Sequence, residues 1–107
     1  MPKLKPNPKL QDFQNYVKEM VKERGFTNNK LETFLLFSEE VGELAKAIRN
    51  YKNLYQEKNS RTKKFKLSDE FADVLIYLLD LANQFEIDLE KAFRRKEQKN
   101  KKRAWIN

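Results

Sequence analysis

Residues that interrupt helices are scarce in this sequence. The chain has 107 residues but only two glycines and three prolines, and all three prolines lie within the first eight residues. Glycine and proline are the residues that most often end helices and mark turns, so the sequence beyond Pro8 offers few places to break. This scarcity predicts an all-α protein. The length fits one domain over residues 1–107, in which residues 1–7 form a flexible arm and residues 96–107 a basic tail.

Capping residues and apolar spacing locate the first two helices. Asn7 is a candidate N-cap, and Pro8 suits the first position of a helix. Gly25 is a candidate helix end. Together they predict a helix over residues 8–24. A second helix is predicted to begin near Asn29, which together with Glu32 resembles a capping box. Its apolar stripe continues to at least residue 50. The polar and basic residues 50–66 are interpreted as a fraying helix end followed by a loop.

The third and fourth helices follow the same logic. Ser68 is the predicted N-cap of a helix that runs to about Phe85, and Asp88 the predicted N-cap of a last helix that leads into the basic tail. Between residues 71 and 82 only Asp73 and Asp80 are neither apolar nor aromatic. Such a helix is expected to be buried on most sides. Four helices of these lengths predict a four-helix bundle or a close relative of one.

Two residue types are absent. Without cysteine the chain can form no disulfide and no thiolate metal site, which fits a reducing cytoplasm. Without histidine it can form no catalytic triad, no histidine-ligated zinc site and no Glu-x-x-His di-iron site. A metal held by this chain therefore needs oxygen ligands, which favours Mg²⁺ or Mn²⁺. The Lys- and Pro-rich start does not resemble a signal peptide, and the apolar runs are too short to span a bilayer, so we expect a cytoplasmic protein.

Charge is segregated along the chain. The net charge is +7, yet residues 31–45 carry four acids and no base, and residues 67–90 carry seven acids and no base. An exposed helix face in a lysine-rich chain should mix signs, because opposite charges four residues apart support a helix. On the second helix, Glu40 and Glu43 lie one turn apart on one side. On the third, one narrow stripe contains Glu70, Asp73, Tyr77, Asp80 and Gln84.

These two acidic stripes suggest a metal site. Glutamates on one helix usually form a solvated face, and for Glu40 and Glu43 alone that remains the simpler interpretation. If the stripes face each other, however, Glu70 and Asp73 join them and four carboxylates converge. Such a cluster is strongly unfavourable without a cation, and a divalent cation that prefers oxygen ligands resolves it.

The same residues resemble a known family. Glu39-Glu40-Val41-Gly42-Glu43 looks like the EExxE motif of the MazG-like all-α nucleoside triphosphate pyrophosphohydrolases, and Glu70-Phe71-Ala72-Asp73 looks like their ExxD motif. Near the end of the chain, the spacing of Lys96, Asn100 and Arg103 is similar to the family's KxxxNxxR pattern. The resemblance covers about residues 31–105. It implies an oligomeric MazG-type fold, a homodimer or homotetramer.

The resemblance also implies the chemistry and the roles of residues. It implies Mg²⁺ bound by Glu40, Glu43, Glu70 and Asp73, and attack of water on the α-phosphate of a nucleoside triphosphate to give a monophosphate and pyrophosphate. This activity is typical of nucleotide-pool house-cleaning. Because the chain has no histidine, a carboxylate must orient or deprotonate the water, and Glu39 is the candidate. It could equally be a group that only supports the metal ligands from outside, or a surface partner of Lys46.

The remaining candidates each have a plainer interpretation. Lys96 and Arg103 could hold phosphate oxygens, or belong to a solubilising tail. Asn100 could bond phosphate or sugar, or be an ordinary polar helix residue. Tyr77 could stack on a base or ribose, or be a buried aromatic edge. Trp105 could cap a base in a neighbouring subunit, or anchor the tail.

Three other functions compete with this hypothesis. A basic helical nucleic-acid-binding module explains the basic segments 46–66 and 91–107 but not the base-free acidic stripes. A phosphoribosyl-ATP pyrophosphohydrolase would use a similar fold and similar chemistry. A regulatory interaction bundle would bind neither Mg²⁺ nor Mn²⁺.

Overall fold

Four α-helices make up the structured part of the chain. The computed structural model describes residues 1–52 and 64–103. In these ranges the helices are α1 (Leu10–Arg24), α2 (Lys30–Tyr51), α3 (Lys64–Gln84) and α4 (Leu89–Lys101), and no strand occurs. The prediction of an all-α protein is therefore confirmed for the described residues. Trp105 and most of the loop predicted over residues 50–66 lie outside them.

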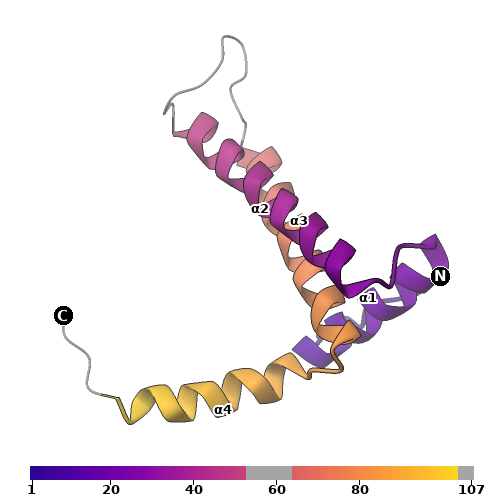
Figure 1. The fold of residues 1–107 in the computed structure, drawn as a ribbon, viewed down its shortest axis with the longest axis vertical. Helices are drawn as coiled ribbons and strands as arrows, with labels where there is room; N and C mark the ends of the chain where they lie inside the picture. The colour runs from indigo at the N-terminus through magenta and orange to yellow at the C-terminus, as the bar shows by residue number, and fades with distance from the viewer. Residues whose placement is uncertain (53–63, 104–107) are drawn as a thin grey trace.

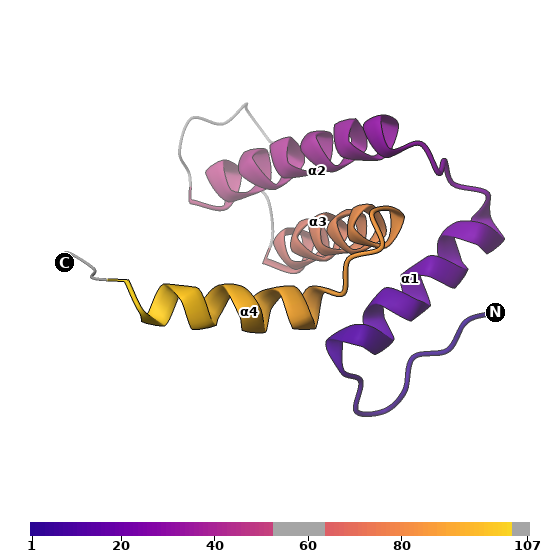
Figure 2. The same ribbon diagram turned by 60° about the horizontal axis from the view of Figure 1, so that its bottom comes forward.

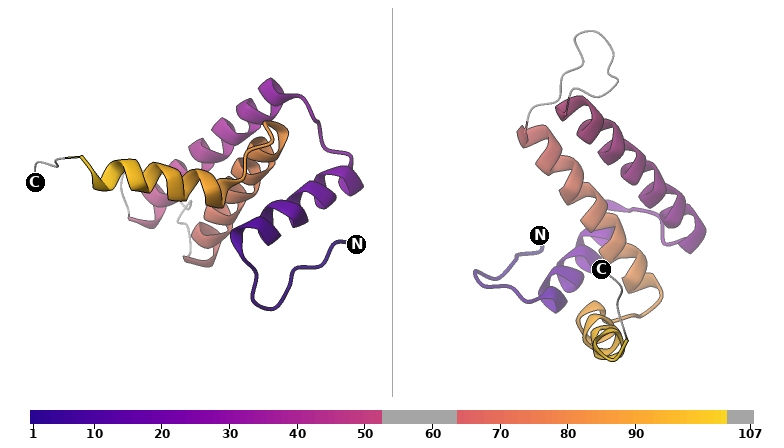
Figure 3. Two further views of the ribbon diagram at one scale, coloured as in Figure 1. Left: turned by 90° about the horizontal axis from the view of Figure 1, so that it is seen from below. Right: turned by 90° about the vertical axis from the view of Figure 1, so that its left-hand side faces the viewer.

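The helices differ in how extensively they contact one another (Figure 1). α2 and α3 run side by side in opposite directions and form the most extensive helix contact, α1 packs across α3, and α4 contacts the start of α1. Figure 2 shows α3 between α2 on one side and α4 on the other, the right-hand view of Figure 3 looks along α4 and places it beyond the end of the α2–α3 pair, and in Figure 1 α4 runs away from that end. Within one chain the four helices are thus an antiparallel pair with two attached helices rather than a closed bundle.

The main core lies between α1 and α3. Val17, Met20 and Leu79 are almost fully buried there, and partly buried neighbours complete the cluster. These neighbours are Leu10, Phe13, Tyr16, Val21, Ile76 and Leu89. The apolar spacing of α1 follows the helical repeat, so one stripe of it faces α3. The core therefore fixes one face of α3 and leaves another face free to meet α2.

Local polar contacts explain three of the predicted helix ends. Asn29 caps α2 through a hydrogen bond of 2.9 Å from the Glu32 backbone N–H to its side-chain oxygen. Asp88 caps α4 in the same way, accepting from the backbone N–H of Lys91 at 3.0 Å. Gly25 ends α1 with a φ of 67°, a left-handed conformation that costs glycine little because it has no Cβ.

The predicted start of α1 is wrong. The helix begins at Leu10, two residues later than predicted, and its N-cap is Lys9 rather than Asn7. The Lys9 backbone N–H donates to the Asp12 carboxylate at 2.8 Å, and Lys5 forms an ion pair with the same carboxylate. An acid in the first turn thus supplies the acceptor that Asn7 was expected to provide, and it suits the helix dipole.

The predicted start of α3 is also wrong. α3 begins at Lys64, so Ser68 lies inside its first turns instead of capping it. Lysine is a good helix former, and Lys66 forms an ion pair with Glu70 one turn later at 2.8 Å. Residues 64–66, which were interpreted as loop, therefore belong to the helix that carries the acidic stripe.

Candidate functional site

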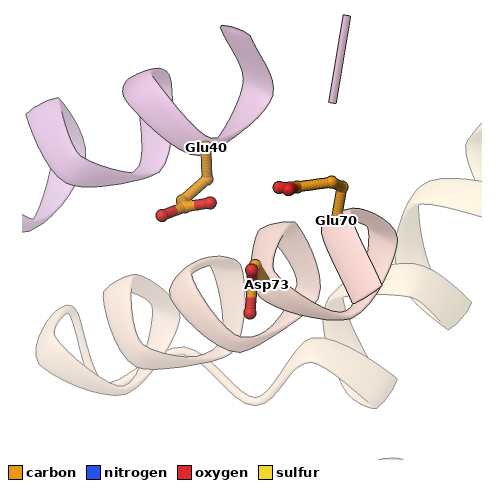
Figure 4. A group of neighbouring side chains, drawn as sticks. All are labelled: Glu40, Glu70 and Asp73. Atoms are coloured by element: carbon orange, nitrogen blue, oxygen red, sulfur yellow. The ribbon is translucent and has the colours of Figure 1, made fainter. Parts of the chain in front are cut away.

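Three carboxylates meet where α2 and α3 face each other. Glu40 points from α2 toward Glu70 and Asp73 on α3, as Figure 4 shows. One carboxylate oxygen of each residue lies within 4.8 Å of the other two. Glu70 and Asp73 share a face of α3 because they are three residues apart, and the antiparallel packing of α2 brings Glu40 opposite them. This group is called the acidic cluster below.

The acidic cluster is partly shielded from water. Glu70 is buried, and Glu40 and Asp73 are half-buried. Desolvation raises the pKa of the Glu40 carboxyl above its ordinary value, and the negative charges of Asp73 and Glu70 raise it further. Both effects disfavour the charged form. The cluster is therefore a place where a cation would be stabilised.

The geometry of the acidic cluster fits a divalent cation held by oxygen. Mg²⁺ binds oxygens at about 2.1 Å, so two ligands on opposite sides of it are about 4.2 Å apart. The three cluster oxygens all lie within 4.8 Å of one another, which is near enough for the carboxylates to share one cation. The described residues thus bring together three of the four predicted ligands.

The fourth predicted ligand lies at the edge of this arrangement. Glu43 follows Glu40 by one turn on α2, and its side chain is exposed. Its negative charge still contributes to the raised pKa of Glu40, as does that of Glu39. Glu39, predicted to act on the water, is exposed as well. Both glutamates therefore flank the acidic cluster on its solvent side.

Lys66 is a site residue that the sequence analysis missed. Its Nζ lies 2.8 Å from Glu70 Oε1, and this contact raises the pKa of the Lys66 ammonium. The ammonium supplies one positive charge to a cluster of three acids. The signal was present in the sequence as a Lys-to-Glu spacing of four residues. It was missed because residues 50–66 were interpreted as a loop.

Tyr77 lies one turn beyond Asp73 and is half-buried. Burial raises the pKa of its hydroxyl, and the charges of Glu40 and Asp73 raise it further. The tyrosine therefore lies close to the acidic cluster, as its place on the stripe predicted. Its hydroxyl stays protonated at neutral pH and is available as a hydrogen-bond donor.

A buried polar group continues the stripe along α3. The Gln84 side-chain amide donates to Thr33 Oγ1 at 2.8 Å and to Asp80 Oδ1 at 3.2 Å. Asp80 is only 5% exposed and Thr33 is fully buried. Desolvation raises the pKa of the Asp80 carboxyl, while the hydrogen bond from Gln84 lowers it by a smaller amount. The hydrogen bond from Gln84 to Thr33 joins α3 to α2 at the end of the helix pair that lies farther from the acidic cluster.

Asp80→Asn is expected to make the free energy of unfolding depend less on pH. A carboxyl whose folded pKa is raised favours folding when protonated, and this contribution is lost as pH rises from about 3.8 through the folded value. Asparagine keeps an oxygen acceptor for Gln84 and cannot ionise. We expect the variant to gain free energy of unfolding relative to wild type between pH 4 and pH 7, measured by urea denaturation. Asp69→Asn, at an exposed position of α3, is the control, and equal curves for the two variants would contradict the prediction.

The last three predicted site residues lie elsewhere in the chain. Lys96, Asn100 and Arg103 are on or just after α4. Lys96 and Asn100 line an apolar groove with Leu75 and Leu78, which are exposed residues of α3. Because α4 and α2 lie on opposite sides of α3 (Figure 2), one chain does not bring these residues to the acidic cluster.

A facing set of carboxylates on an antiparallel helix pair defines an all-α protein with a candidate site for a divalent metal. The sequence signature of the MazG nucleotide pyrophosphohydrolase domain matches residues 28–105. The chain therefore belongs to the MazG nucleotide pyrophosphohydrolase domain family. The matched range contains the acidic cluster as well as Lys96, Asn100 and Arg103.

Solved structures agree with this assignment. The chain is similar to YPJD from Bacillus subtilis, a proposed pyrophosphatase, with a TM-score of 0.74 and 27% sequence identity. That match covers 94% of this chain and 100% of YPJD. The chain is also similar to iMazG from Vibrio DAT 722, with a TM-score of 0.65, 33% identity and coverage of 87% and 98%. The expected MazG-type fold is therefore confirmed. A comparison with curated proteins gives no match.

None of the helices in the described part of the chain has the length and apolar character needed to cross a bilayer.

Proposed function

We propose that this protein is a Mg²⁺-dependent pyrophosphohydrolase that converts a nucleoside triphosphate to a monophosphate and pyrophosphate. The observation that carries the proposal is the acidic cluster of Glu40, Glu70 and Asp73, in a chain of the MazG family. A bound divalent cation, Mg²⁺ or in its place Mn²⁺, would neutralise phosphate charge and lower the pKa of a coordinated water. A role in removing unwanted nucleotides from the cytoplasmic pool follows from such an activity.

The residues in and around the acidic cluster have different roles in the proposed hydrolysis. Glu40, Glu70 and Asp73 hold the metal, and Glu43 joins them from the exposed side of α2. Glu39, exposed beside the cluster, orients the attacking water and accepts its proton. Lys66, whose ammonium lies 2.8 Å from Glu70 Oε1, would be placed to bind a phosphate oxygen once a cation took its place at Glu70. Tyr77 donates its hydroxyl proton in a hydrogen bond to the sugar or base, or stacks against it.

The products identify the reaction. With Mg²⁺ present, we expect a screen of nucleoside triphosphates and deoxynucleoside triphosphates, standard and modified, to yield monophosphate and pyrophosphate in equal amounts. Attack at the α-phosphate gives these products, whereas attack at the γ-phosphate gives diphosphate and phosphate. Anion-exchange chromatography separates the four species. A diphosphate product would contradict the mechanism, and binding of nucleic acid without turnover of any triphosphate would favour the alternative function.

We also propose that the protein is a homodimer or a homotetramer. α3 was expected to be buried on most sides, yet Phe71, Leu75 and Leu78 are each at least 40% exposed in one chain. On α2, Leu31 and Leu35 are more than half exposed. Apolar surface on this scale is typical of an interface that remains covered in the assembled protein.

Sedimentation tests this assembly directly. At micromolar concentration we expect a dimer or tetramer and no detectable monomer. Leu35→Lys, which places a charge on the exposed apolar face of α2, should shift the equilibrium toward monomer by burying a charge without a partner. Lys22→Glu on the exposed side of α1 is the matched control and should leave the mass unchanged. A wild-type monomer would contradict the proposal.

A further inference from the structure

The ammonium group of Lys66 is in direct contact with the acidic cluster. Its Nζ lies 2.8 Å from Glu70 Oε1, and Glu70 is the most buried member of the cluster (Figure 4). The Glu70 side chain is 6% exposed, whereas that of Lys66 is 58% exposed. The lysine therefore reaches from the solvent to a buried carboxylate, and in the free protein it supplies that carboxylate with a positive charge.

Lys66 is one of several bases at this end of the helix pair. Within the described residues, five bases occur where α2 ends and α3 begins: Lys46, Arg49, Lys52, Lys64 and Lys66. Lys66 differs from Lys46 in its place on the helix. It precedes Glu70 by one turn and so shares the stripe of the metal ligands, whereas Lys46 is an exposed residue beyond Glu43. Lys46 thus offers a nearby charge for comparison.

A divalent cation and the Lys66 ammonium compete for Glu70. A cation that takes Oε1 replaces the ammonium, and a cation that takes the other carboxylate oxygen lies close to it and is repelled. In both cases, binding of the metal alone costs the contact between Lys66 and Glu70 or weakens it. Removing a charged hydrogen-bond partner is more costly than removing a neutral one. The metal therefore binds more weakly than three carboxylates alone would bind it.

A phosphate group bound beside the metal reverses this disadvantage. Its oxygens are negatively charged and accept a charge-assisted hydrogen bond from an ammonium group. Lysine has a flexible four-carbon stem, and Lys66 is more than half exposed, so its ammonium can move without movement of α3. With metal and phosphate both present, Glu70 keeps a cation and Lys66 gains an anion. The metal alone satisfies only Glu70.

We propose that Lys66 is a built-in competitor of the metal, which weakens binding of a divalent cation alone and strengthens binding of the cation together with a phosphate group. The inference rests on the proposed function for the identity of the phosphate ligand, and on the contact between Lys66 and Glu70 for the competition. Binding of metal and phosphate is then mutually dependent, because a coupling free energy acts equally on both ligands.

Titration with Mn²⁺ alone tests the competition. Electron paramagnetic resonance measures free Mn²⁺ as the full chain is titrated in the absence of any phosphate. Lys66→Gln should bind Mn²⁺ at least about fivefold more tightly than wild type, because no charged hydrogen bond has to be replaced. Lys66→Arg keeps the charge and should stay within about twofold of wild type, as should Lys46→Gln, since a more distant exposed charge is screened by salt.

Three results of this titration would overturn the competition. They are an unchanged affinity in Lys66→Gln, a weaker affinity, and an equal gain in Lys66→Gln and Lys46→Gln. The last result would mean that net charge alone, and not the contact with Glu70, controls the metal. Circular dichroism in EDTA checks that each variant is folded. Lys66→Met is a second variant without the charge, and methionine is a good helix former.

Binding of inorganic triphosphate tests the phosphate contact and should change in the opposite direction. This probe offers phosphate oxygens without any base or sugar. With Mg²⁺ in excess, calorimetry should show at least about fivefold weaker binding to Lys66→Gln than to wild type, because a charge-assisted hydrogen bond is lost. A general structural defect would weaken both ligands, and unchanged triphosphate binding would overturn the phosphate contact.

The two measurements separate this inference from the proposed function. If both effects appear in a protein that hydrolyses no nucleoside triphosphate, the role of Lys66 is supported and only the proposed function is refuted. If the wild type hydrolyses a triphosphate and neither effect appears, the role of Lys66 is refuted and the proposed function stands.

Discussion

Asp73→Asn is expected to lower the rate of triphosphate hydrolysis at least about 100-fold while the helices remain folded. Loss of a group that merely orients a metal ligand costs about 10–100-fold in metal affinity or activity, so loss of a ligand should cost no less. Asparagine has nearly the same shape as aspartate but carries no charge, and it relieves repulsion from Glu40 and Glu70. The variant should therefore be at least as stable as wild type in EDTA. Steady-state kinetics and circular dichroism measure the two effects.

Asp69→Asn is the matched control for this loss. Asp69 is on the same helix, its side chain is exposed, and the substitution changes the net charge by the same amount. Its rate should stay within about twofold of wild type, because exposed substitutions away from such sites change free energies by about 0.5 kcal/mol or less. Equal rates for the two variants would show that the acidic cluster does not bind the catalytic metal.

Mg²⁺ is expected to raise the melting temperature of the wild type by roughly 10 °C or more when it is present at 100 times its Kd. A ligand that binds only the folded state adds about 2.7 kcal/mol at that concentration, and 1 kcal/mol shifts the melting temperature of a domain of this size by about 4–8 °C. Glu40→Gln removes one ligand from the acidic cluster, so Mg²⁺ should stabilise it much less. Thermal melts with EDTA and with Mg²⁺ measure this difference, and equal shifts in both proteins would contradict the metal site.

The same melts should depend on pH in a defined direction. Burial and neighbouring acids raise the folded pKa of Glu40 above its ordinary value of 4.5. Its contribution to stability is present below pH 4.5 and is lost as pH rises through the folded pKa, because the unfolded chain releases the proton first. In EDTA the wild type should therefore lose more stability between pH 5 and pH 7.5 than Glu40→Gln does. Mg²⁺ should cancel that loss, since it binds the ionised form.

The helices and the centre of the site could be predicted because they depend on local spacing. Asn29, Gly25 and Asp88 end or begin helices at the predicted places, since each makes its capping contact within a few residues. Glu70 and Asp73 share a face for the same reason. That Glu40 lies opposite them depends on α2 packing against α3, which the paired acidic stripes suggested and the structure confirms.

Other features depend on contacts that spacing does not reveal. The start of α1 was placed wrongly because Asp12 accepts the capping hydrogen bond from Lys9, and that of α3 because the helix already begins at Lys64, where Lys66 pairs with Glu70. The hydrogen bonds of Gln84 join Asp80 on α3 to Thr33 on α2, a contact between two different helices. The separation of Lys96 from the acidic cluster follows from the direction in which α4 leaves the turn after Gln84, where Glu86 adopts a φ of 57°. A one-dimensional pattern contains no information about that direction.

Gln14 has a consequence for how the chain folds during synthesis. Its buried side chain donates to Asn83 and to the Ile87 carbonyl and accepts from the Leu89 backbone N–H, at separations of 69 to 75 residues. A ribosome adding 5–20 residues per second needs about 4–15 s to produce those partners. During that interval the residues of α1 have no partner for their apolar stripe or for the Gln14 side chain. α1 is the first helix to be synthesised and is therefore among the last to pack against its partners. Chaperones that recognise exposed apolar segments have several seconds in which to bind it.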